Sequence, residues 1–335
     1  MCQSVAEPEK MTPLGTHKRI CLFSPAKINL FLHVIGQRLD GYHDLVSLMQ
    51  MVDFGDEILF DISPEGILLK GEGASLPPTE KNLVFRAASL LKRECGVSQG
   101  VRIFLKKVIP ISAGLGGGSS NAAATLLGLN LLWNLNLSRG DLIRFGDQLG
   151  ADVPFFFQGP LALALEKGGK LVPLKGGTPL SVLLVNPGIS ISTGGVFRSF
   201  QAQQNIHQEK TFPKPESLGL LKKWLTIVQE QFKISDFEKP RFSFPDVLAS
   251  LRNDLESVVF NQYPQVQKIK EDLQALGTLM TLMSGSGSTV FAIFENPEKM
   301  KRAKKALKTG PGWMVRETST LERSPWKKEL SKLRI

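Results

Sequence analysis

The chain has 335 residues, of which 42% are hydrophobic and 21% charged, and its formal net charge is +10. This length allows two domains with buried cores, and the composition is that of an ordinary globular protein. No apolar run reaches membrane-spanning length, and the first 18 residues lack the apolar core of a secretory signal.

The first half of the chain predicts mainly strands that lead to a glycine-rich segment. The strand at 28–35 alternates, and its second face carries Lys27, Asn29, Phe31 and His33. A lysine beside an asparagine is unusual for a core face, so we expect this face to be the wall of a site. The other elements predicted here are a strand at 20–23, a hairpin formed by 57–62 and 67–70, a helix at 82–92 and a strand at 101–108.

The glycine-rich segment precedes a run of helix formers, 121–127. Glycine lets backbone amides approach a ligand, and a helix N-terminus attracts anions, so we expect a polyphosphate to bind there. Two serines at its end are expected to cap the helix. A tight turn without a ligand would need fewer glycines. The segment consists of Pro110, Ile111, Ser112, Ala113, Gly114, Leu115, Gly116, Gly117, Gly118, Ser119 and Ser120.

After this helix, a capping box at 138–141 and an apolar stripe predict a second helix that stops at Gly150. Asp152 follows, beside three phenylalanines, and we expect apolar surroundings that would make its carboxylate a better base.

A change of composition near 175–179 suggests a domain boundary. Beyond it we predict a strand at 181–185, a polar stretch at 201–245, a helix at 264–276, strands at 278–283 and 289–294, a helix at 297–308 and a strand at 314–317.

Cysteine usage and the distribution of charge bear on compartment and partners. Cys2, Cys21 and Cys95 are odd in number and lack C-x-x-C spacing, which favours a reducing cytoplasm over disulfides or a cysteine metal site. The histidines show no metal-ligand spacing. Lysine and arginine residues gather at 299–308 and 327–334 without interleaved aromatic side chains, so we interpret them as solvated faces and expect no nucleic-acid partner.

The glycine segment matches neither common nucleotide-binding pattern. Gly169-Lys170 is followed by Leu171, which excludes a Walker loop, and Ser119 stands where the dinucleotide pattern needs glycine. The segment instead resembles the P-x-x-x-G-L-G-G-G-S-S loop of the GHMP kinases. Three further segments resemble the members of this family that act on 4-diphosphocytidyl-2-C-methyl-D-erythritol: 24–30 with 38–43, 149–154 and 284–291.

The resemblance implies roles for individual residues. It implies that Asp152 takes a proton from the acceptor hydroxyl and that Lys27 orients Asp152 and stabilises charge on the γ-phosphate. ATP with Mg²⁺ would be the cofactor. It implies that substrate is bound by Asn29, Tyr42, His43, Thr193, Phe197, Gly285, Ser286 and Gly287.

The resemblance also implies the cytidine subsite. Tyr42 and His43 would recognise the cytidine, with Phe197 on the other side of the base. Asn121 stands where many family members have aspartate, a departure expected to affect helix capping more than chemistry.

The implied fold is a two-domain α+β architecture. The N-terminal domain, 20–178, resembles the ribosomal protein S5 domain 2-like fold, and the C-terminal domain, 179–323, a ferredoxin-like layer; 1–19 and 324–335 are expected to be tails. The implied activity is ATP-dependent phosphorylation of the 2-hydroxyl of the cytidine diphosphate substrate, in the non-mevalonate isoprenoid pathway. We expect a cytoplasmic monomer or weak homodimer, with no membrane partner. The alternatives are a GHMP kinase acting on homoserine or mevalonate, and a non-catalytic RNA-binding protein.

Overall fold

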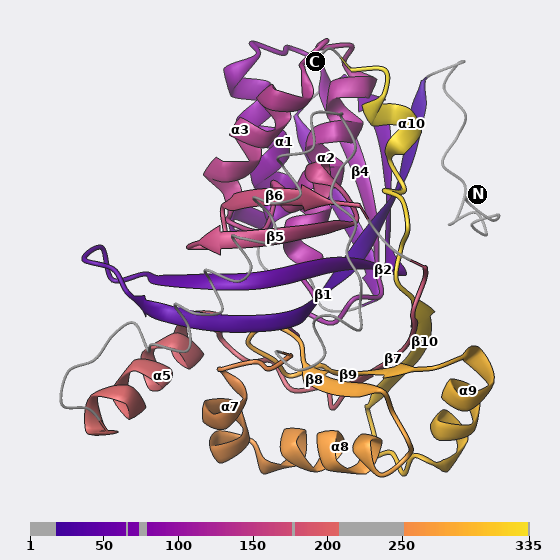
Figure 1. The fold of residues 1–335 in the computed structure, drawn as a ribbon. Helices are drawn as coiled ribbons and strands as arrows, with labels where there is room; N and C mark the ends of the chain where they lie inside the picture. The colour runs from indigo at the N-terminus through magenta and orange to yellow at the C-terminus, as the bar shows by residue number, and fades with distance from the viewer. Residues whose placement is uncertain (1–17, 65, 74–78, 176–177, 208–250, 334–335) are drawn as a thin grey trace, which may run out of the picture.

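The structure of the protein is a computed structural model that describes residues 18–64, 66–73, 79–175, 178–207 and 251–333 (Figure 1). Most of the predicted N-terminal tail and most of the 201–245 stretch lie outside the described residues. Within the described part of the chain, no helix is both long and apolar enough to cross a bilayer.

The first sheet has six strands and is organised around β2 (His43–Ser63), which is 21 residues long. One edge of β2 pairs antiparallel with β1 (Arg19–Gln37). Its other edge pairs with β5 (Leu161–Glu166) over its first half and with β4 (Gly100–Lys107) over its second. At the two ends of the sheet lie β3 (Ile67–Gly73) and β6 (Lys170–Leu174).

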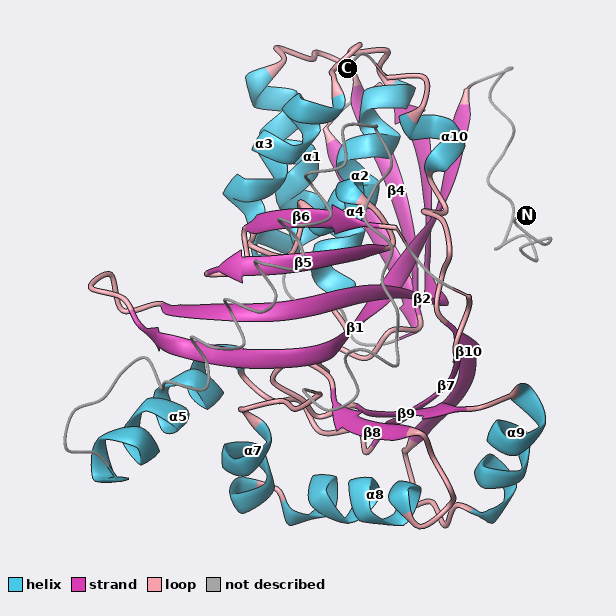
Figure 2. Cartoon of the chain, in the orientation of Figure 1, coloured by secondary structure: helices cyan, strands magenta, loops and turns pink. Residues whose placement is uncertain are grey.

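Helices cover one face of this sheet (Figure 2). The Asn82 side chain caps α1 (Leu83–Glu94), and the predicted Ser138–Asp141 capping box begins α3 (Arg139–Leu149). Between them α2 (Gly117–Leu132) is apolar on all sides and almost wholly buried, as expected of a central helix. The short helices η1 (Thr79–Lys81) and α4 (Phe155–Gln158) complete the layer.

The second sheet has four antiparallel strands in the order β10-β7-β9-β8. Helices lie between β7 and β8 and between β9 and β10, which gives the β-α-β-β-α-β order of a ferredoxin-like layer. The strands are β7 (Ser181–Asn186), β8 (Met280–Met283), β9 (Val290–Phe294) and β10 (Met314–Ser319), and the helices α5 (Thr193–His207), α7 (Glu256–Gln262), α8 (Pro264–Gln274) and α9 (Pro297–Ala306).

The two sheets share a hydrophobic core. Ile28 and Leu30 of β1 belong to one buried cluster with Val182 and Leu184 of β7 and Phe291 of β9. Helices α7, α8 and α9 lie on the opposite side of the second sheet, whereas α5 lies beside the β1–β2 ribbon (Figure 1). The connection from β4 to α2 contacts the connection from β8 to β9.

Three predictions about the elements were wrong. The strands at 20–23 and 28–35 are one continuous strand, β1. Residues 57–62 and 67–70 do not form a hairpin, because β4 lies between β2 and β3 and pairs with both. The prediction of a C-terminal tail was wrong for residues 324–333, because α10 (Lys327–Leu330) forms there and Trp326 is buried. The domain boundary at 178/179 stays a prediction and falls between β6 and β7.

Candidate active site

The glycine segment lies between β4 and α2 and forms the beginning of α2. Gly114 and Gly116 adopt positive φ angles of 77° and 66°. Gly116 is the N-cap residue of α2 and offers no side chain to the free N–H groups of the first turn. The expected serine cap was wrong, because Ser119 and Ser120 lie inside the helix. Unsatisfied N–H groups at the start of a 16-residue helix suit an anion.

The glycines are also required by neighbouring protein atoms. A Cβ on Gly116 would lie 2.9 Å from Lys27 Cγ, and one on Gly114 would lie 2.0 Å from the Ser284 carbonyl oxygen. The Lys27 backbone N–H donates to the Leu115 carbonyl (2.9 Å). The loop therefore packs directly against β1 and against the second glycine motif, which the sequence did not reveal.

Lys27 and Asp152 form the charged centre of the site. Lys27 projects from β1 and is only 4% exposed; its Nζ lies 3.7 Å from Asp152 Oδ2. The same Nζ donates to Asn29 Oδ1 at 2.6 Å, and Asn29 Nδ2 donates to Ser47 Oγ at 2.7 Å. The buried Lys27 ammonium group thus joins Asn29 of β1 to Asp152, which lies far from both in the sequence. A lysine held in this way can direct its charge at an adjacent reacting group.

Asp152 lies in the turn after α3, and its surroundings differ from those expected. Phe155, Phe156 and Phe157 are buried in the core of the first sheet and its helices. The Asp152 side chain itself is 37% exposed, and the Lys27 ammonium group is its charged neighbour. The structure therefore gives the carboxylate an exposed face beside a cation, where an acceptor hydroxyl could reach it.

The second glycine motif joins β8 to β9 and touches the first. Ser284 Oγ donates to the Gly114 carbonyl (2.9 Å), and the Thr289 N–H donates to the Ala113 carbonyl (3.2 Å). Ser286 Oγ lies 2.8 Å from Thr193 Oγ1, at the start of α5. The Ser284 hydroxyl is thus engaged with the other loop.

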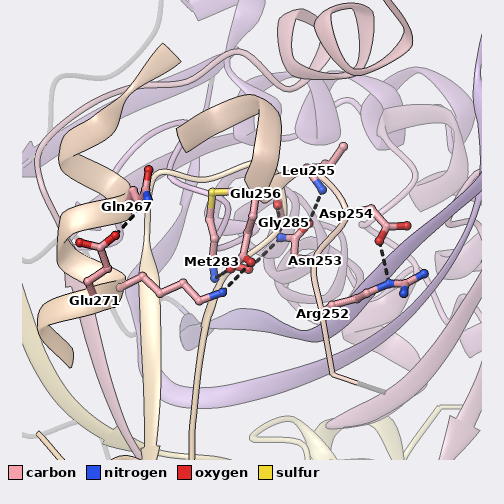
Figure 3. A network of polar contacts seen from close by, with 10 residues as sticks. Arg252, Asn253, Asp254, Leu255, Glu256, Gln267, Glu271, Met283 and Gly285 are labelled. Carbon is pink, nitrogen blue, oxygen red and sulfur yellow. Dashed lines mark hydrogen bonds and ion pairs between the residues drawn. The ribbon is translucent and has the colours of Figure 1, made fainter. Parts of the chain in front are cut away.

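A segment that the sequence analysis did not single out supports this motif (Figure 3). Asn253 Nδ2 donates to the carbonyls of Met283 (2.8 Å) and Gly285 (2.7 Å). Glu256 accepts from the Met283 N–H (2.9 Å) and pairs with Lys270 (2.7 Å). In this segment Asn253 Oδ1 also accepts from the Leu255 N–H (3.0 Å). An asparagine that can form such a turn is the local feature of the sequence that could have pointed to the segment.

A second missed network lies beneath the first glycine loop. Asp56 is fully buried and accepts from Lys107 Nζ (2.6 Å) and from the N–H groups of Val108 (2.7 Å) and Ile109 (2.8 Å). Burial lowers the pKa of Lys107, and the Asp56 charge opposes that shift. Asn121, expected to matter for capping, donates instead to Asp56 Oδ2 (2.9 Å). The network anchors the chain where it leaves β4 for the loop.

The residues predicted for base recognition lie at the far end of the β1–β2 ribbon. The rings of His43 and Phe197 stack, with centroids 5.2 Å apart and planes inclined by 29°. Tyr42 is 63% exposed, and Lys167 Nζ lies 5.5 Å from the centroid of its ring. Burial lowers the pKa of His43, so the imidazole is neutral at pH 7. The structure brings His43 and Phe197 together and leaves the Tyr42 ring free on its exposed side.

Two family models match the chain. The model of the GHMP kinases N terminal domain matches residues 82–160, and that of the GHMP kinases C terminal domain matches residues 237–311. The first match includes the glycine loop and Asp152, and the second includes Asn253 and the second glycine motif. Fold and site therefore define the class of the protein as GHMP kinases.

Curated relatives narrow this class. The chain is 44% identical over 296 residues to the 4-diphosphocytidyl-2-C-methyl-D-erythritol kinase of Syntrophus aciditrophicus (strain SB), over 88% of this chain and 96% of that one. It is 40% identical to the kinase of the same name from Syntrophotalea carbinolica (strain DSM 2380 / NBRC 103641 / GraBd1), over 87% and 95% of the two chains. The chain belongs to the family of 4-diphosphocytidyl-2-C-methyl-D-erythritol kinases, and it is an ATP-dependent small-molecule kinase.

Solved structures agree with the fold. A crystal structure of 4-(cytidine 5'-diphospho)-2C-methyl-D-erythritol kinase is 32% identical, with a TM-score of 0.67, and covers 90% of this chain and 100% of that one. A homoserine kinase from Cytophaga hutchinsonii ATCC 33406 is 19% identical with a TM-score of 0.61, over 94% and 99% of the two chains, and shares the fold alone. The predicted GHMP kinase α+β fold is confirmed.

Proposed function

We propose that this kinase transfers the γ-phosphoryl group of ATP to the 2-hydroxyl of 4-diphosphocytidyl-2-C-methyl-D-erythritol, in the non-mevalonate isoprenoid pathway. The products are ADP and the 2-phosphate of the acceptor. The relatives named for this substrate, 37–44% identical among those compared, support the choice of acceptor.

The observation that carries the proposal is the Lys27–Asp152 pair, 3.7 Å apart beside the start of α2. Asp152 accepts the proton of the acceptor hydroxyl. The hydroxyl oxygen forms the new bond to the γ-phosphorus, and the bond between that phosphorus and the ADP oxygen breaks. Lys27, buried and fixed by Asn29, stabilises the negative charge that spreads over the transferring group. Positioning and charge stabilisation account for most of catalysis in phosphoryl transfer.

The residues at the start of α2 fit a nucleotide polyphosphate. Gly116 caps the helix without a side chain, so the N–H groups of residues 117–119 can donate to phosphate oxygens. Mg²⁺ bound with ATP would neutralise phosphate charge during transfer. The Ser119 hydroxyl, partly exposed in the first turn of α2, would offer that ion an oxygen ligand.

Acceptor recognition is proposed for the aromatic residues of the ribbon and α5. His43, neutral at pH 7, would hydrogen-bond the cytosine edge, and Tyr42 and Phe197 would contact its faces. Asn29, Thr193 and the 285–287 backbone would contact the remainder of the acceptor. The stacking of His43 on Phe197 supports a shared subsite built from β2 and α5.

We also propose that the enzyme is cytoplasmic and acts as a monomer or weak homodimer, without nucleic acid or membrane. The odd number of cysteines and the absence of C-x-x-C spacing support a reducing compartment. Light scattering of the purified chain measures the oligomeric state.

A coupled ADP-release assay tests the proposed function. The full chain with ATP and Mg²⁺ is given the cytidine diphosphate substrate, homoserine or mevalonate in parallel, and RNA binding is measured by filter retention. We expect turnover with the cytidine substrate alone. Turnover with homoserine or mevalonate would contradict the acceptor assignment, and RNA binding without any turnover would favour the non-catalytic alternative.

A further inference from the structure

The C-terminal segment returns from the second sheet to the first. Thr320 forms a bridge with Val52 of β2, and the Leu321 N–H donates to the Met51 carbonyl (2.9 Å). Gln50 Nε2 donates in turn to the Leu321 carbonyl (3.0 Å). Met51 is the β2 residue paired with Lys27 of β1, so this segment lies one strand away from the catalytic lysine. Both matched family models end before it.

Trp326 is the anchor of this segment. It is 1% exposed, and its indole Nε1 donates to the Phe23 carbonyl at 2.7 Å. The indole centroid lies 6.1 Å from the Phe157 ring and 6.5 Å from the Phe156 ring. A buried indole whose N–H is satisfied has one fixed orientation, so it can hold its neighbours in place.

These neighbours are the two segments that carry the charged centre of the site. Phe23 precedes Lys27 by four residues in β1, and Phe156 follows Asp152 by four residues in α4. Helix α4 has only four residues and cannot be stable alone, so packing fixes its position. Trp326 thus contacts β1 four residues before Lys27 and α4 four residues after Asp152.

We propose that Trp326 is a positioning residue that sets the distance between Lys27 and Asp152, with residues 320–330 acting as a clasp on the first sheet. This inference rests on the proposed catalytic roles of the pair. A misplacement of about 1 Å in a reacting group can cost about 100-fold in rate. Loss of the clasp should therefore change kcat more than it changes ATP binding.

The test compares Trp326→Phe and Trp326→Leu with Trp133→Phe. Trp133 belongs to the same core cluster but lies at the far end of α2, and its Nε1 has no hydrogen-bond partner. Melting temperature, kcat, and KM for ATP and for the cytidine substrate are measured well below the melting transition. We expect kcat to fall about tenfold or more in both Trp326 variants, with KM for ATP within about twofold. Trp133→Phe should lower the melting temperature only.

Amide hydrogen exchange provides a readout that does not depend on turnover. We expect the Trp326 variants to exchange faster at 152–158 and at 23–27, whereas Trp133→Phe leaves both segments unchanged. If the wild type shows no turnover, the proposed function fails while the exchange result still decides the clasp. Unchanged exchange in these segments, or a kcat loss no greater than that of Trp133→Phe, would overturn the inference.

Discussion

Lys27 serves the fold and, in the proposed mechanism, also the chemistry. Its stem packs against Gly116, its backbone N–H holds Leu115, and its ammonium group lies between Asn29 and Asp152. Burying an ammonium group costs free energy unless the group is paired. Here Asn29 accepts a hydrogen bond from it, and Asp152 supplies the opposite charge. The residue is therefore fixed before substrate arrives, and in the proposed mechanism this makes its charge effective in the transition state.

Replacing Lys27 by methionine should lower kcat about 100- to 1,000-fold, the usual cost of losing one group that stabilises transition-state charge. KM should change less, because the ammonium group matters most while the phosphoryl group moves. Steady-state kinetics at saturating ATP measure this. Lys70→Met, on an exposed residue of β3, is the matched control and should behave as wild type. A rise in KM with kcat unchanged would make Lys27 a binding residue only.

His43 leads to a pH prediction at the same scale. Its pKa is lowered from the ordinary value of 6.5 because burial disfavours the imidazolium. The imidazole therefore stays neutral down to a pH below 6.5, and KM for the cytidine substrate should be flat above that pH and rise below it. His43→Ala should weaken binding of the cytidine substrate by about 1–3 kcal/mol, and its KM should rise accordingly. The variant should also lose the pH dependence, while KM for ATP stays constant. An unaltered acceptor KM in the variant would remove His43 from base recognition.

At the scale of elements, the site is the contact between two glycine-rich connections. The first joins β4 to α2 and the second joins β8 to β9, and they exchange hydrogen bonds directly. Asp56 accepts from the Val108 N–H and so fixes the start of the first connection. Asn253 donates to the Gly285 carbonyl and so fixes the second (Figure 3). Each loop is thus held at its root by a buried side chain, which suits a preformed site.

Gly116→Ala should damage both loop and lysine. The new Cβ would meet Lys27 Cγ at 2.9 Å, and a φ of 66° costs alanine about 1–2 kcal/mol. We expect a lower melting temperature, weaker ATP binding and a reduced kcat. Gly140→Ala is the control, because Gly140 lies in α3, outside the loop, and its Cβ would meet only Ser138 Oγ, at an ordinary 3.6 Å. Calorimetric titration with ATP and a kcat measurement decide this, and equal behaviour of the two variants would contradict the contact with Lys27.

At the scale of the whole molecule, short contiguous motifs were the part that could be predicted. The capping box was predicted correctly, and the structure brings the glycine segment, Lys27 and Asp152 together as candidates. Each of these signals spans a few neighbouring residues. Asp56, Asn253 and Trp326 were missed because their partners are distant: Trp326 bonds a carbonyl 303 residues away. No local periodicity reports such a contact, and the wrong hairpin has the same cause, since β4 enters between β2 and β3 from further along the chain.

The most direct test of the account is a single-turnover measurement of phosphoryl transfer with saturating ATP and the cytidine diphosphate substrate. The wild type is compared with Asp152→Asn, which keeps shape but cannot accept the proton, and with Asp147→Asn, an exposed aspartate of α3. We predict that Asp152→Asn slows transfer by about 100- to 10,000-fold at unchanged ATP affinity, while Asp147→Asn matches the wild type. Wild-type transfer by a folded Asp152→Asn variant would contradict the assignment of Asp152 as the base.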